Sequence, residues 1–457
     1  MHNGRTPVID ALVDFVREVD TGSLPREVRE AAGLCLMDWL GTAIRGALEP
    51  LALALHTVIA TTGGDRQATV VGQGMRTSAL LACLANGAQA HALDFDDTHI
   101  PSLVHASAPV APVVLAVGEW KRRSGAEAIA AFIGGFEVET RIGRAIGYGL
   151  AQRGWHVTGI LGHFGAAAAA GKLLGLTAGE LKHALGIAGT QAAGLEQAFG
   201  TMCKPLHPGK AAMNGLLAAL LAKEGFTGPV EILEGATGLP VTFLGATELG
   251  SALDGLGKRF EILENSTKPY AACHLTHATI DAGRAIHERW APAPDAIASV
   301  ECWVYPLTLK VAANPAPRTG LEAKFSVAFC AALGLARGEA GEAEFTDDLI
   351  RDAAVARLAS RVQPHADAAM AVGATRMRVR LADGRVLEEH IKAARGTAEN
   401  PQSQDELETK FRRLCEGVLP PDKVSGLVGA LRGIEGLEDI RTLTALAMPD
   451  GETGRRG

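Results

Sequence analysis

The sequence predicts a mainly α protein that consists of a large all-helical domain with an inserted α+β lid domain. Three observations lead to this fold class. Apolar residues recur at helical spacing through residues 1–263, alternating and β-branched residues appear within residues 264–400, and a new helix start follows before residues 401–457. At 457 residues the chain is also too long for one ordinary core.

The first segment reads as successive helices. Apolar positions recur at helical spacing in "TPVIDALVDFVREV", and "SLPREVREAAGLCLMDWLGTAI" opens with Ser23 as the expected N-cap. Small residues let helix axes approach closely, so the Ala- and Gly-rich stretches that follow predict a compact multi-helix domain. These stretches are "GAEAIAAFIGGFEVETRIGRAI", "HFGAAAAAGKLLGL", "TAGELKHALGIAGTQAAG" and "GKAAMNGLLAALLAKEG".

The middle segment has the pattern of strands. "IASVECWVYPLTLKVA" and "ATRMRVRLADGRVLEEHIKAA" alternate, and the second contains Asp383-Gly384 between two alternating runs, a strong hairpin signal. The following loop ends at Ser403, with Glu406 three residues later, which is the pattern of a capping box. We therefore expect the chain to return to the helical domain, which makes residues 264–400 an insertion.

Composition narrows the functional classes. The formal net charge is −7, and the two signs are interspersed without the basic stripe of a nucleic-acid-binding protein. The seven cysteines are scattered without a C-x-x-C pair, which argues against a disulfide framework, a structural zinc site or an iron–sulfur cluster. No run of about 18 uninterrupted apolar residues and no signal-peptide core is present. We expect a cytoplasmic protein without a membrane or nucleic-acid partner.

The stretch "HALDFDDTH", residues 91–99, holds three carboxylates and two imidazoles. If it is helical, Asp94 and Thr98 lie one turn apart on one face. His105 follows a break near Pro101 and can converge with them on a pocket. A carboxylate that orients an imidazole or acts as a base, and a helix end capped by carboxylates, both fit this pattern. A metal site fits less well, because the spacing matches no standard zinc or EF-hand pattern.

Two later stretches add cations and imidazoles. "RGWHVTGILGHFG" places His156 in a Gly-flanked loop and His163 before an Ala-rich helix, where a satisfied core histidine is the commoner role. In "GLEQAFGTMCKPLHPGK", Lys204 and His207 precede a helix that is expected to begin near Pro208. An anion would find a cation and free backbone N–H groups there, although a surface lysine near a helix start gives the same pattern.

The boundary between the first two segments, "STKPYAACHLTHATIDAG", repeats this combination with Lys268, Cys273 and His274. Clefts between domains are favoured ligand sites. A buried cysteine is more often inert than nucleophilic. The sequence contains no phosphate-binding loop and no G-x-G-x-x-G after a strand. This set of cations, carboxylates and imidazoles favours a small polycarboxylate ligand over a nucleotide.

These stretches resemble the MmgE/PrpD family, which includes 2-methylcitrate dehydratase, cis-aconitate decarboxylase and iminodisuccinate epimerase. The matching motifs occur in family order: "NGAQAHALDFDDTH", "GWHVTGILGHFGAAAAAGKLLGL", "KPLHPGKAAMNGLLAALLAKEGFTGP", "KPYAACHLTHATIDA", "EAKFSVAFCAALGL" and "ENPQSQDELETKF". The resemblance implies a homodimer with an active site between the domains and no cofactor or metal. The positions that match the decarboxylase pocket are Asp94, Thr98, His105, His156, Lys204 and Lys268.

Three features depart from the decarboxylase pattern. Cys273, next to His274, stands where the decarboxylase has a histidine, and Val311 stands where it has a pocket tyrosine. One extra residue separates Thr98 from His105. The resemblance therefore indicates a lyase that transfers a proton at a carbon next to a carboxylate. We expect a 2-methylcitrate dehydratase-like hydro-lyase, with an epimerase or a decarboxylase as alternatives and a non-catalytic helical binding protein as a remote one.

In this scheme the added negative charge of a carbanion or enolate-like species requires positioned cations and donors. Lys204 and Lys268 are expected to hold substrate carboxylates, and His105 and His156 to exchange protons. Asp94 is expected to orient one imidazole. For an epimerase, Tyr148 or His163 would join the set. The substrate-contacting residues would further include Thr98, His207, Cys273 and His274, whereas Asp96 and Asp97 are expected to be structural.

Overall fold

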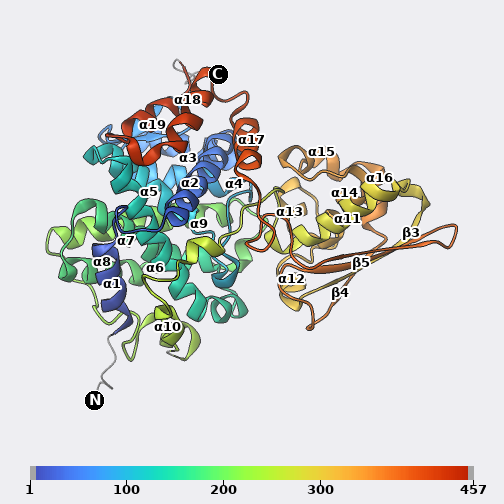
Figure 1. Ribbon diagram of the computed structural model, residues 1–457, viewed down its shortest axis with the longest axis horizontal. Helices are drawn as coiled ribbons and strands as arrows, with labels where there is room; N and C mark the ends of the chain where they lie inside the picture. The colour runs from blue at the N-terminus through green and yellow to red at the C-terminus, as the bar shows by residue number, and fades with distance from the viewer. Residues whose placement is uncertain (1–6, 247, 451–457) are drawn as a thin grey trace.

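The structure is a computed structural model that describes residues 7–246 and 248–450. It is mainly helical, with a smaller α+β unit projecting from one side of a large helical body (Figure 1), so the predicted fold class is confirmed. Residues 1–6 and 451–457, the outer ends of the first and last predicted segments, lie outside the described residues.

The helical body begins with ten helices and one short hairpin. The hairpin joins β1 (Ala68–Val70) to β2 (Met75–Thr77). The helices are α1 (Val8–Glu18), α2 (Arg26–Gly46), α3 (Pro50–Thr62), α4 (Ala79–Ala92), α5 (Ser107–Lys121), α6 (Gly125–Gln152), α7 (Val157–Leu174), α8 (Ala178–Thr190), α9 (Cys203–Lys223) and α10 (Leu239–Leu244).

The expected N-cap of α2 is wrong. The helix begins at Arg26 after Pro25, whose fixed φ of −54° suits a helix start. The hydroxyl of Ser23 instead donates to the carbonyl of Asp20 in the preceding turn.

Close contacts between small residues hold the centre of the helical body together. α7 packs against α5, α6, α8 and α9, and α4 packs against α9. A Cβ atom added to Gly87 in α4 would lie 2.8 Å from the Cα of Gly209 in α9. α7 is long and apolar enough to cross a membrane, but 94% of it is buried inside the protein, as in a core helix. The approach of α4 to α9 positions the site described below.

The α+β unit is a four-stranded sheet with helices packed on it. The strand order is β4-β3-β5-β6, with β3 and β4 parallel and the other pairs antiparallel. The predicted hairpin is confirmed, with Asp383 and Gly384 in the turn between β5 and β6. The strands are β3 (Ile297–Val304), β4 (Val362–Ala366), β5 (Thr375–Leu381) and β6 (Val386–Ile391). The helices are α11 (His277–Trp290), α12 (Pro306–Val311), α13 (Gly320–Ala323), α14 (Val327–Arg337), α15 (Asp347–Ile350) and α16 (Ala353–Ala359).

The chain then returns to the helical body through α17 (Gln404–Cys415), α18 (Pro421–Arg432) and α19 (Arg441–Leu446). The capping box of Ser403 and Glu406 forms as predicted at the start of α17. α17 and α18 pack against α2, and α19 packs against α5, as Figure 1 shows. The ammonium of Lys410 in α17 lies 2.6 Å from the carboxylate of Asp38 in α2, and both side chains are buried. The α+β unit is thus inserted between two parts of one helical body.

Candidate active site

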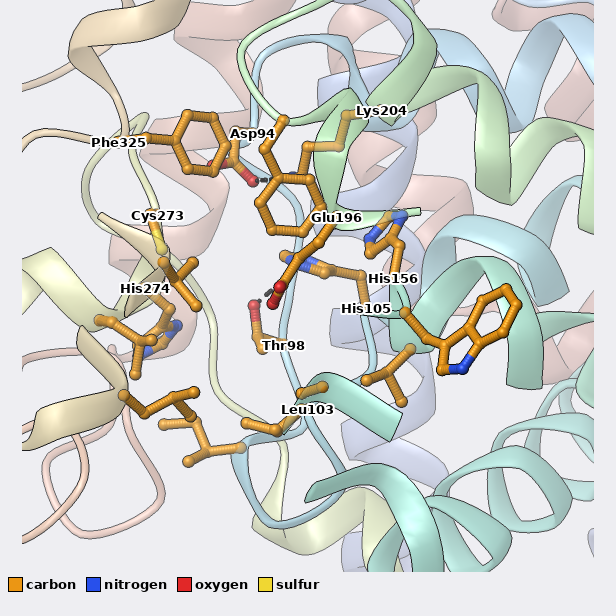
Figure 2. Close-up of a pocket in the computed structure, with 18 residues that line it drawn as sticks. Asp94, Thr98, Leu103, His105, His156, Glu196, Lys204, Cys273, His274 and Phe325 are labelled. Carbon is orange, nitrogen blue, oxygen red and sulfur yellow. Dashed lines mark hydrogen bonds and ion pairs between the residues drawn. The ribbon is translucent and has the colours of Figure 1, made fainter. Parts of the chain in front are cut away.

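A cleft lies where the helical body meets the α+β unit, and Figure 2 shows polar side chains from both pointing into it. The cleft has a cavity volume of about 90 Å³. From the helical body its lining includes Asp94, Thr98, Ile100, Leu103, His105, Ala151, Trp155, His156, Val157, Glu196, Phe199 and Lys204. The remaining lining residues are Cys273, His274, Leu275, Leu307, Val311 and Phe325.

The segment that carries Asp94 and Thr98 is not helical, which corrects the expected helical face. α4 ends at Ala92, and Asp94 has a left-handed φ of 51°. Thr98 exchanges two backbone hydrogen bonds with Ser266, of 2.8 and 3.0 Å. Asp94 and Thr98 therefore reach the same cleft through a turn and a strand-like bridge. They do not lie one turn apart on the face of a helix, as the sequence suggested.

Asp94 forms a buried cluster with two lysines. Its Oδ1 accepts hydrogen bonds of 2.8 Å from Lys204 and 2.9 Å from Lys268. Burial alone would raise the pKa of Asp94, but the two ammonium groups outweigh it and hold that pKa well below its usual range. Lys268 is fully buried and lies behind Asp94 without lining the cleft, whereas Lys204 lines it. Two cations and one carboxylate leave an excess positive charge at this end of the cleft.

His105 is held in one tautomer. Its Nδ1 lies 2.9 Å from the backbone carbonyl oxygen of Asp97 and 3.2 Å from the Thr98 hydroxyl. A carbonyl oxygen only accepts, so Nδ1 carries the proton and Nε2 keeps its lone pair. Burial lowers the pKa of His105, and the carboxylate of Asp96 offsets part of this effect. The ring is therefore neutral near pH 7, and its free Nε2 can accept a proton.

Asp96, and not Asp94, is the carboxylate beside the imidazoles. Asp96 is fully buried, and its Oδ2 lies 2.8 Å from Nδ1 of His91 and 3.5 Å from Nδ1 of His105. The rings of His91 and His105 meet edge to face, with centroids 4.5 Å apart. Asp94, expected to orient an imidazole, instead faces the two lysines, and Asp96, expected to be structural, lies beside the imidazoles. Asp97, expected to be structural, accepts hydrogen bonds from Ser107 and Asn265.

His156 and His207 form a second imidazole pair, with Nδ1 atoms 2.9 Å apart. The expected irregular stretch before Pro208 is wrong: α9 begins at Cys203, so Lys204 and His207 lie in its first turns and Pro208 lies inside it. His156 lines the cleft, whereas His207 supports it from behind. Burial, reinforced by the charge of Lys204, holds the pKa of His156 well below its usual value. One nitrogen of this neutral ring is a hydrogen-bond donor.

The remaining candidates divide between the cleft and the core. Cys273 and His274 line the cleft. Burial raises the pKa of Cys273 to about 11, so it is a thiol at neutral pH and not an activated nucleophile. His163 is buried in α7, where its Nε2 accepts a 3.2 Å hydrogen bond from Asn214. Tyr148 lines a different depression, on the opposite side of Ile100 and Pro101.

Four side chains have the spacing of a metal site. One ligand atom from each of His91, Asp94, Asp96 and His105 lies within 4.8 Å of the others. Protein groups occupy some of the possible ligand atoms, although Nε2 of His91 and Oδ2 of Asp94 have no hydrogen-bond partner among the described residues. The Nδ1 protons of both imidazoles point to oxygen acceptors, and Oδ1 of Asp94 accepts from two ammonium groups. Lys204 and Lys268 already place two positive charges beside Asp94, so the set fits a hydrogen-bonded cluster better than a metal centre.

Sequence reasoning did not find Glu196, whose side chain points into the cleft (Figure 2). It is the only acidic residue in "AGLEQAFGTM", but no pattern in that stretch indicates which way it faces. Phe199 and Phe325 were also missed. Their rings pack 5.6 Å apart and lie 5.7 and 5.3 Å from the ammonium of Lys204, where they shield its charge from water.

Two family models match this chain. Residues 10–251 match the MmgE/PrpD N-terminal domain, and residues 270–428 match the MmgE/PrpD C-terminal domain. The chain belongs to the MmgE/PrpD family.

Curated relatives align over nearly the full length of this chain. A cis-aconitate decarboxylase from Aspergillus terreus is 29% identical, with 97% of this chain and 96% of that protein covered. The cis-aconitate decarboxylase-like protein oryM of Aspergillus oryzae is 26% identical, with coverages of 95% and 96%. The human cis-aconitate decarboxylase is 27% identical, with coverages of 96% and 94%. These relatives are enzymes of the lyase type.

Proposed function

We propose that this protein is a lyase that transfers a proton at a carbon next to a carboxylate of a small polycarboxylate, without a metal or cofactor. The observation that carries this proposal is the tautomer of His105. Its proton is fixed on Nδ1 by the carbonyl of Asp97, so Nε2 is the free nitrogen of a cleft-lining residue. A neutral imidazole in a partly closed cleft is a suitable general base.

The charges around His105 support the same reaction. Lys204, with Lys268 behind it, leaves a net positive end at which a substrate carboxylate can bind and an enolate-like charge can develop. When His105 takes a proton, the buried carboxylate of Asp96, 3.5 Å away, stabilises the resulting imidazolium. His156 lies on the same cleft wall, where its ring can hydrogen-bond a leaving group.

Among reactions of this class, we favour hydration or dehydration of a hydroxy acid. Dehydration needs a base and a group that holds the departing hydroxyl, and His105 and His156 on the cleft wall can fill these two roles. The names of the relatives favour decarboxylation of cis-aconitate as the second candidate. Against it, Cys273 and Val311 occupy the two positions where that pattern has a histidine and a tyrosine, and both line the cleft.

Turnover of a substrate panel tests this proposal. The purified protein is incubated with 2-methylcitrate, citrate, cis-aconitate and iminodisuccinate, with and without EDTA, while alkene absorbance, CO2 and optical rotation are followed. We expect turnover of at least one polycarboxylate, at the same rate with EDTA. Strong inhibition by EDTA contradicts the metal-free mechanism, and turnover confined to CO2 release selects the decarboxylase over the hydro-lyase.

A further inference from the structure

Glu196 lines the same cleft as Asp94 and Lys204, from the short 3-10 turn Glu196–Ala198, and its side chain points into it (Figure 2). Its backbone N–H donates a 2.9 Å hydrogen bond to the carbonyl of Gly154, which fixes the turn beside the start of α7. The side chain is 19% exposed, so a ligand in the cleft can reach it.

Lys310 lies behind this carboxylate. Its ammonium is 3.5 Å from Oε2 of Glu196 and donates a 2.5 Å hydrogen bond to the carbonyl of Ala151. Glu196 lines the cleft and Lys310 does not. Although the pair is neutral overall, the group presented to a ligand is the carboxylate. Across residues 7–246 and 248–450, no side chain hydrogen-bonds to Oε1 of Glu196, so this atom is available to accept.

The cleft therefore presents two groups of opposite charge, Lys204 and Glu196. Lys204 attracts one carboxylate of a substrate. A carboxylate placed against Glu196 would meet a like charge in a partly desolvated site, which is unfavourable. A hydroxyl or amino group at the same place would donate to a charged acceptor, one of the stronger hydrogen bonds available in a protein.

We infer that Glu196 is a specificity-determining residue that selects dicarboxylates bearing a hydroxyl or amino group over substrates that would place a third carboxylate beside it. This inference rests on the proposed function for its substrate class and narrows it. Glu196 accepts a hydrogen bond from the substrate, and Lys310 anchors its carboxylate from behind.

Calorimetric binding of three probes tests the inference without requiring turnover. The probes are succinate, with two carboxylates; malate, with an added hydroxyl; and tricarballylate, with a third carboxylate. The wild-type protein should bind malate more tightly than succinate and tricarballylate most weakly. In Glu196→Gln, the preference for malate over tricarballylate should fall by about tenfold or more, because the charged acceptor becomes a neutral amide.

Two variants serve as controls. Glu30→Gln makes the same change in an exposed ion pair with Arg26, outside the cleft, and should leave all three affinities unchanged. Lys310→Met removes the ion pair but keeps the carboxylate, so it should retain the preference for malate over tricarballylate.

Several results would overturn the role of Glu196. They are equal binding of malate and tricarballylate by the wild type, no binding of any probe, an equal change for all probes in Glu196→Gln, or a Lys310→Met variant that reproduces Glu196→Gln. None of these decides the proposed function, which depends on turnover and on His105.

Discussion

Replacing His105 with Asn removes the nitrogen that we assign as the general base but keeps a donor in place of its Nδ1–H. The amide Nδ2 of Asn can replace the 2.9 Å hydrogen bond to the carbonyl of Asp97. What is lost is Nε2 and the edge-to-face contact with His91, at 4.5 Å between centroids. A positioned general base contributes about 10²–10⁴-fold to the rate. The aromatic contact contributes about 0.5–1.5 kcal/mol to stability.

We therefore expect His105→Asn to lower kcat by at least about 100-fold and the free energy of unfolding by only about 1 kcal/mol. The assays are initial rates on the best substrate of the panel and urea unfolding. His390→Asn makes the same substitution at an exposed position of β6 and should change neither quantity. A kcat within tenfold of the wild-type value, with the protein folded, would refute the role of His105 as the base.

Three further predictions concern the charges of the site. Lys204→Met removes the cation that lines the cleft, so KM should rise by about tenfold or more. Circular dichroism should show that the fold is retained. An unchanged KM would contradict the assignment of Lys204 as a binding site for a substrate carboxylate. Asp94→Asn leaves the fully buried Lys268 without its carboxylate. The free energy of unfolding, measured by urea denaturation, should fall by about 3–5 kcal/mol. A loss below about 1 kcal/mol would show that Lys268 has another partner. Because burial lowers the pKa of His105, its basic form persists below the ordinary value of about 6.5. In a pH profile, kcat/KM should thus stay level from neutral pH down to about 6.5 and fall at lower pH as the ring is protonated, whereas a fall beginning above pH 7 would contradict this assignment.

The sequence predicted the architecture well because its signals are local. The hairpin turn at Asp383-Gly384 and the capping box at Ser403 each depend on residues within a few positions of one another, and both form. The helix starts were less predictable. Pro25 replaces Ser23 as the N-cap of α2, and α9 begins five residues before Pro208, although a proline inside a helix removes one backbone hydrogen bond.

The candidate site was predicted only in part. Residues named from the sequence, such as Asp94, Thr98 and His105, do line one cleft. Their partners were not predictable, because the turn at Asp94, with its left-handed φ, places Asp94 beside the lysines and leaves Asp96 beside the imidazoles. Glu196 gave no signal, since the direction of a side chain in an irregular turn depends on tertiary contacts such as the hydrogen bond to Gly154.

Deuterium exchange tests the central claim, proton transfer at a carbon next to a carboxylate by His105, most directly. The wild-type protein and His105→Asn are incubated in D2O with the polycarboxylate that the panel identifies, and the reaction is followed by proton NMR. We predict that the wild-type protein incorporates deuterium at the carbon next to the carboxylate, in the product or in recovered substrate, and that His105→Asn does so at least about 100-fold more slowly. Hydration or decarboxylation by the wild-type protein without deuterium at that carbon, or equal exchange by the variant, would contradict the account, because both reactions add a proton there.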